Sequence, residues 1–167
     1  MSTPTEHDLA AAAARLGGAL VAKEWTLCSA ESSTAGLIGH AVTMIPGASR
    51  YYLGGVIAYS NLAKAFELGV AEDMITTHGA VSEEVAAAMA EGVRSRFDTD
   101  LAVAVTGIAG PDGASAGKPR GLHFVAACRR GHPPTVERHV FSGDREANKA
   151  AAALAALELA HREIEAG

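Results

Sequence analysis

The five residues Leu101-Ala102-Val103-Ala104-Val105 (LAVAV) decide the fold class of this chain. A continuous apolar run of this length is typical of a central strand that is buried on both faces. A long helix is predicted before this run, beginning at Ser82 as the N-cap with acidic residues in its first turn and ending near Phe97. A glycine- and proline-rich loop, residues 107–121, follows it. We therefore place LAVAV at the centre of a sheet.

Alternating helices and strands are predicted on both sides of this centre. Helices are predicted over residues 8–23, 35–44, 62–68 and 71–76, with strands over residues 26–30, 54–59, 122–128 and 135–141 and a last helix from Asp144 to about residue 163. The last two strands form a hairpin. This order predicts an α/β fold, a three-layer α/β/α sandwich with a mixed sheet, as a single domain over residues 1–167.

The composition limits the classes of function. The 167 residues are 49% hydrophobic and carry a formal net charge of −5, so we expect a globular protein that does not bind nucleic acid. No apolar run approaches a membrane span, and the polar start does not resemble a signal peptide, which predicts a cytoplasmic protein. Cys28 and Cys128 are predicted to be buried thiols, and no histidine pair has zinc-ligand spacing, so no metal is expected.

Polar residues follow three of the predicted strands. These residues are Glu31-Ser32-Ser33-Thr34, then Tyr59-Ser60-Asn61 with Lys64, and then Thr106-Gly107. Ligands of open α/β sheets bind outside the carboxyl ends of the strands, so the three groups are expected to converge on one crevice.

Ser32 is the candidate nucleophile of that crevice. It stands where a strand turns into a helix, so main-chain amides near Ser33 and Thr34 would hold a developing oxyanion. Lys64 is the candidate base if burial lowers its pKa, and the hydroxyl of Tyr59 would lie between the two. The alternatives are a serine that only caps the helix and a solvated lysine.

The loop over residues 107–121 is a candidate phosphate-binding segment. Its glycines expose main-chain amides, which Lys118 or Arg120 would assist. It matches neither a Walker A motif nor a dinucleotide fingerprint, and a plain strand connection is the alternative.

Six ordered blocks of the sequence resemble one known family, the C-terminal domain family of the competence/damage-inducible protein CinA. The resemblance covers about residues 8–159. The blocks are Ala30-Glu31-Ser32-Ser33-Thr34-Ala35-Gly36, Pro46-Gly47-Ala48-Ser49, Tyr59-Ser60-Asn61-Leu62-Ala63-Lys64, His78-Gly79-Ala80-Val81-Ser82, Thr106-Gly107-Ile108-Ala109-Gly110-Pro111 and Phe141-Ser142-Gly143-Asp144-Arg145.

The resemblance implies hydrolysis of the carboxamide of nicotinamide mononucleotide to nicotinic acid mononucleotide and ammonia, in pyridine-nucleotide salvage and without a cofactor. It implies Ser32 as nucleophile, Lys64 as general base and Tyr59 as the partner of the lysine. It further implies Thr106 as a site residue and Arg145 as a substrate contact. We expect a stand-alone amidohydrolase domain, and a homodimer is an open alternative to a monomer.

Two residues depart from the family pattern. Ser33 replaces a cysteine, and Ala35 replaces a glycine whose backbone would be strained by a methyl group if its φ is positive. These departures keep two rival readings open. One is a nucleotide-binding module without turnover, linked to competence or DNA damage. The other is a serine amidase for another small amide.

Overall fold

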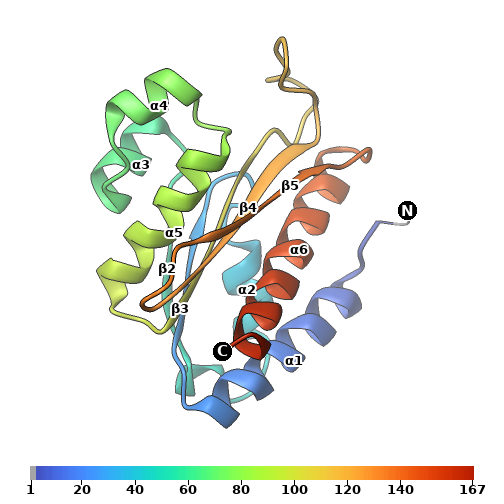
Figure 1. The fold of residues 1–167 in the computed structure, drawn as a ribbon. Helices are drawn as coiled ribbons and strands as arrows, with labels where there is room; N and C mark the ends of the chain where they lie inside the picture. The colour runs from blue at the N-terminus through green and yellow to red at the C-terminus, as the bar shows by residue number, and fades with distance from the viewer. Residues whose placement is uncertain (1–2) are drawn as a thin grey trace.

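The computed structural model describes residues 3–167, so the first two residues of the predicted domain lie outside the described part (Figure 1). The helices are α1 Glu6–Lys23, α2 Leu37–Thr43, α3 Asn61–Leu68, α4 Glu72–His78, α5 Glu83–Phe97 and α6 Arg145–Glu165, with one 3₁₀ turn at Ala48–Arg50. The strands are β1 Leu27–Glu31, β2 Tyr52–Ile57, β3 Leu101–Gly107, β4 Leu122–Arg129 and β5 Thr135–Val140. The predicted α/β class with a mixed sheet is confirmed.

The strands form one sheet in the order β2-β1-β3-β4-β5. β1 is parallel to both of its neighbours, β2 and β3, whereas β4 runs antiparallel to β3 and to β5. The carboxyl ends of β1, β2 and β3 therefore meet at one edge of the sheet. This is the edge at which the polar groups of the sequence were expected to converge.

The two faces of the sheet carry side chains of different size. On β3, Leu101, Val103 and Val105 face α1, α2 and α6, while Ala102 and Ala104 face α5. Figure 1 shows α1 and α6 on one side of the sheet and α3, α4 and α5 on the other. The LAVAV stretch is fully buried, as predicted for a central strand. The small alanine side chains allow α5 to approach its face of the sheet closely.

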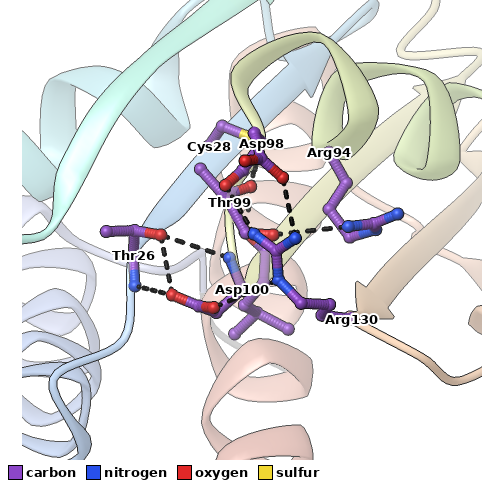
Figure 2. Close-up of polar contacts among 8 residues, drawn as sticks. Thr26, Cys28, Arg94, Asp98, Thr99, Asp100 and Arg130 are labelled. Atoms are coloured by element: carbon purple, nitrogen blue, oxygen red, sulfur yellow. Dashed lines mark hydrogen bonds and ion pairs between the residues drawn. The ribbon is translucent and has the colours of Figure 1, made fainter.

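Figure 2 shows a polar cluster at the opposite end of the sheet, where β1 and β3 begin. The carboxylate of Asp100 accepts hydrogen bonds from the N–H (2.9 Å) and the hydroxyl (2.8 Å) of Thr26. Arg130 donates to Asp98 (2.7 Å) and to Asp100 (3.3 Å). The cluster therefore joins the α5–β3 turn to the start of β1 and to the connection after β4.

The observed boundaries differ from the predicted ones near the functional edge. β2 begins and ends two residues earlier than expected, so Tyr59 lies beyond the strand. α2 begins at Leu37 because Ala35 (φ 51°) and Gly36 (φ 98°) have left-handed backbone conformations that a right-handed helix excludes. β3 continues through Thr106 to Gly107, because its pairing with β4 extends that far.

Candidate functional site

A crevice of about 270 Å³ lies at the carboxyl edge of β1–β3. It brings together most of the residues that the sequence singled out, although they are far apart along the chain. Its lining includes Ser32, Ser33, Tyr59, Lys64, Thr106, Gly107, Ile108, Ala109, Gly110, Asp112 and Arg145. Thr34 lines a neighbouring cavity of about 740 Å³ instead, and Arg145 borders both.

Ser32 is fixed by both neighbouring strands. Its N–H donates to the carbonyl of Val105 on β3 (2.9 Å). The carbonyl of the preceding residue, Glu31, accepts from the N–H of Ala58 just after β2 (2.9 Å). Because the main chain is held on both sides, the position of the Ser32 side chain at the crevice is determined by the sheet itself.

Lys64 reaches Ser32 from α3, which Ser60 caps by accepting a hydrogen bond from Ala63 N–H (3.1 Å). The side chain of Lys64 is only 1% exposed, and its Nζ lies 3.0 Å from Ser32 Oγ. No Asp or Glu of residues 3–167 forms an ion pair with it. Burial therefore lowers the pKa of Lys64 to about 8.

The contacts of Lys64 fit both protonation states of its amine, because the three N–H groups of the charged form match the oxygens of Ser32, Ala58 and Tyr59. Nζ also lies 2.9 Å from the carbonyl oxygen of Ala58 and 3.2 Å from that of Tyr59. A neutral amine has two N–H groups and one lone pair. If the two N–H groups serve the two carbonyls, the lone pair faces Ser32 Oγ and can accept its proton. The geometry therefore fits a general base acting on a serine.

The Tyr59 hydroxyl does not lie between Ser32 and Lys64. Those two side chains contact each other directly, and Tyr59 meets the lysine through its main-chain carbonyl. The tyrosine is 61% exposed, and its hydroxyl accepts a hydrogen bond from Arg145 Nη2 (3.2 Å). Arg145 Nη1 donates to the carbonyl of Gly110 (2.7 Å). Tyr59 and Arg145 thus form one wall of the crevice.

The sequence places Glu31 in the polar group after the first strand but gives it no role, and the structure shows one. Its buried carboxylate accepts from the N–H groups of Gly36 (2.9 Å), Ile38 (3.1 Å) and Gly39 (2.9 Å). These are the amides that open α2, so neither the hydroxyl of Ser32 nor those of Ser33 and Thr34 caps the helix. The available signal was a Glu that ends a buried strand before a helix whose N-cap residue, Gly36, has no side chain.

The turn after Ser32 has polar groups without partners. Within the described residues, the main-chain N–H groups of Ser33 and Thr34 donate to no protein acceptor, and their buried hydroxyls are also unpaired. Since buried polar groups are normally hydrogen-bonded, these groups are candidates for contact with a ligand. An oxyanion held here would face the turn and not the first turn of α2, whose amides Glu31 occupies.

Thr106 and Gly107 support the floor of the crevice. The Thr106 hydroxyl donates to the carbonyl of Ala80 (2.8 Å), which ties β3 to the segment before α5. A side chain at Gly107 would collide with the ring of His123 on β4. Gly107 therefore allows the buried histidine to pack directly beside the site.

The two basic residues of the glycine-rich loop lie outside the crevice. Lys118 donates to the carbonyl of His78 (2.6 Å), and Arg120 packs against Gly110. The loop instead contributes Gly110, Asp112 and Gly113 to the crevice lining. In the part of the chain described, no group of three potential metal ligands gathers, and no helix has the length and apolarity to cross a membrane.

Comparisons with known proteins agree with this arrangement. A family model described as the CinA C-terminal domain matches residues 9–164. A "CinA-like protein" of Salinibacter ruber is 50% identical over 153 residues, 89% of this chain and 36% of that protein. A "Nicotinamide-nucleotide amidohydrolase PncC" of Enterobacter agglomerans is 46% identical over 98% of both chains. The chain spans about a third of the length of the Salinibacter protein and of two further curated relatives.

Solved structures give the same result. A CinA superfamily protein of Klebsiella pneumoniae superposes with a TM-score of 0.91 at 31% identity, covering 95% of this chain and 99% of that one. The competence/damage-inducible protein CihA of Agrobacterium tumefaciens has a TM-score of 0.89 at 37% identity, covering 95% of this chain and 96% of that one. The arrangement of helices and strands is therefore shared along nearly the whole chain.

Proposed function

The chain belongs to the CinA C-terminal domain family, and on that premise we propose that it hydrolyses the carboxamide of nicotinamide mononucleotide to nicotinic acid mononucleotide and ammonia. The observation that carries the proposal is the 3.0 Å contact between Ser32 Oγ and the buried amine of Lys64. The PncC relative, named a nicotinamide-nucleotide amidohydrolase, supports the choice of substrate because it aligns with this chain from end to end.

The first half of the reaction forms an ester on Ser32. Neutral Lys64 takes the proton of the Ser32 hydroxyl while Oγ attacks the carboxamide carbon. The negative oxygen of the tetrahedral intermediate accepts hydrogen bonds from the N–H groups of Ser33 and Thr34. Protonated Lys64 then gives its proton to the amide nitrogen, the C–N bond breaks, and ammonia leaves.

The second half releases the acid. A water molecule gives a proton to Lys64 and attacks the ester carbon, and the same N–H groups hold the negative oxygen. Lys64 returns the proton to Ser32 Oγ as the ester bond breaks. Nicotinic acid mononucleotide is released with the new oxygen in its carboxyl group, which loses the second water proton to solvent, and Ser32 and Lys64 regain their starting protonation.

Tyr59 and Arg145 bind the rest of the substrate. The pyridine ring of the substrate is a cation, and the exposed Tyr59 ring at the crevice offers a face for it. Arg145 uses one N–H of each Nη for Gly110 and Tyr59, which leaves three N–H groups for a phosphate. These contacts are the basis for choosing the nucleotide over free nicotinamide.

The test is ammonia release from nicotinamide mononucleotide by purified wild type, Ser32→Ala and Lys64→Arg proteins. We expect release by the wild type and a loss of about 10³-fold or more in both variants, because arginine cannot act as a base. A substrate panel of nicotinamide, its riboside and its mononucleotide identifies the amide. Tight binding of the mononucleotide without ammonia release would instead indicate a non-catalytic nucleotide-binding module.

A further inference from the structure

We propose that Asn148 is a positioning residue of this site, an inference that rests on the proposed function. Asn148 lies one turn into α6 and is fully buried. Its side-chain Nδ2 donates to the carbonyls of Ala109 (3.0 Å) and Gly143 (3.0 Å), and its Oδ1 accepts from the N–H of Gly143 (2.9 Å). All three bonds join main-chain groups of two other segments to α6.

The contact with Ala109 lies just beyond the last main-chain hydrogen bonds between the segments that extend β3 and β4. The last main-chain pairs between the β3 and β4 extensions are Ile108 N–H to Leu122 (2.8 Å) and Gly121 N–H to Ile108 (2.7 Å). The next two carbonyls, those of Ala109 and Gly110, are held by side chains of α6. Asn148 binds the first, and Arg145 binds the second.

Asn148 also fixes the place of Arg145. Two hydrogen bonds join Asn148 to the residues just before α6. Gly143 N–H donates to Asn148 Oδ1, and Asn148 N–H donates to the carbonyl of Asp144 (2.9 Å). Arg145 lies between these bonded residues. Because it stands three residues before Asn148, both side chains lie on the same face of the helix. A change at Asn148 would therefore displace the loop wall and the arginine together.

Only an amide satisfies all of these groups. Two carbonyls require two N–H donors, and the Gly143 N–H requires an acceptor, which matches the donor and acceptor set of asparagine. An aspartate has no donor when ionised, and an alanine leaves buried main-chain groups without partners. Asn148 does not line the crevice, so it acts through Ala109, Gly110 and Arg145 and does not touch the substrate.

The test compares Asn148→Ala and Asn148→Ser with Leu157→Ala, a buried α6 residue far from the loop. We expect both Asn148 variants to raise KM for nicotinamide mononucleotide by roughly tenfold with kcat nearly unchanged. The riboside, which lacks the phosphate for Arg145, should show a much smaller change. Leu157→Ala should lower the melting temperature without moving KM. Equal losses for both substrates, or a changed kcat at constant KM, would overturn the proposal.

A second measurement separates this proposal from the proposed function. If folded wild type releases no ammonia from nicotinamide mononucleotide, the proposed function fails. Hydrogen exchange of residues 108–112 then decides the role of Asn148. Faster exchange there in Asn148→Ala or Asn148→Ser, but not in Leu157→Ala, supports the positioning role. Unchanged exchange in a folded Asn148 variant contradicts it.

Discussion

At the scale of single residues, Lys64 is the clearest case of a side chain whose burial lowers the stability of the fold. Its amine is buried beside two carbonyls and a hydroxyl, and no carboxylate of residues 3–167 forms an ion pair with it. Because burial lowers its pKa from 10.5 to about 8, the charged form costs about 3 kcal/mol of folding free energy below pH 8. That cost disappears as the pH rises from 8 towards the pKa of the unfolded chain.

We therefore expect Lys64→Met to be more stable than wild type at pH 7. The gain should be about 1–2 kcal/mol, since the two carbonyls lose their donor. The advantage should shrink as the pH rises from 8 to 10, because the folded wild-type amine is then neutral and the unfolded one begins to lose its proton. Urea unfolding at pH 7 and pH 10 measures both values. A variant that is less stable at pH 7 would show that Lys64 is not strained by burial.

In the proposed mechanism, the same pKa also sets the pH dependence of activity. Lys64 acts as a base only when neutral, so kcat/KM for nicotinamide mononucleotide should rise about tenfold per pH unit below pH 8 and level off above it. Initial rates between pH 6 and 10 test this expectation. A profile that is flat across pH 8 would remove Lys64 from the role of base.

Ala35 carries a strain that its neighbour Gly36 avoids. Its φ of 51° is in the left-handed region, where a side chain is less favourable than the hydrogen of glycine. The methyl group itself is exposed, so the strain lies in the backbone. Ala35→Gly should stabilise the protein by about 0.5–1 kcal/mol. The control is Gly69→Ala, at φ 68° in open space, which should destabilise by a similar amount. Thermal unfolding of both variants checks the expected opposite signs.

At the scale of elements, the cluster in Figure 2 fixes how β1 and β3 enter the sheet. Partial burial of Asp100 opposes its charge, but the hydrogen bonds from Thr26 and Arg130 keep the pKa of Asp100 below its usual value. A lowered carboxyl pKa stabilises the fold above pH 4, and the contribution is lost as the pH falls through the folded value.

We expect Asp100→Asn to lower the free energy of unfolding by about 1–2 kcal/mol at pH 7, because the three hydrogen bonds to its carboxylate are weakened. The difference from wild type should narrow below pH 4. Because the cluster lies at the opposite end of the strands from Ser32, kcat/KM should stay unchanged. Urea unfolding at pH 7 and pH 3.5, with a parallel activity assay, tests both statements. Lost activity in a folded variant would contradict the separation of the two ends.

The elements also show where sequence patterns stop being informative. The LAVAV strand and the long helices could be predicted because apolar runs and caps are local signals. The start of α2 could not, because it depends on the backbone at Ala35 and on the carboxylate of Glu31 folding back onto the helix amides. The end of β2 was misplaced because Ala58 pairs with Glu31 outside the regular strand.

At the scale of the whole molecule, the convergence of polar groups followed from topology. Once β1, β2 and β3 are parallel neighbours, Ser32, Lys64 and Thr106 must meet at one edge. The orientation of side chains was beyond the sequence. The hydroxyl of Tyr59 contacts Arg145 of α6, and Lys118 contacts His78 of α4. Local sequence patterns do not show where these two helices pack in the fold.

The position of Arg145 on the last helix affects how the protein matures during synthesis. Ser32 and Lys64 are translated first, and roughly 4–16 seconds pass before the ribosome reaches Arg145 at typical rates of elongation. Through this interval the nascent chain contains Ser32 and Lys64, the proposed nucleophile and base, but neither Arg145 nor the contacts that α6 makes with the loop. In the proposed function, the unfinished polypeptide therefore lacks its phosphate contact until α6 is made, and it should bind the mononucleotide more weakly than the complete chain.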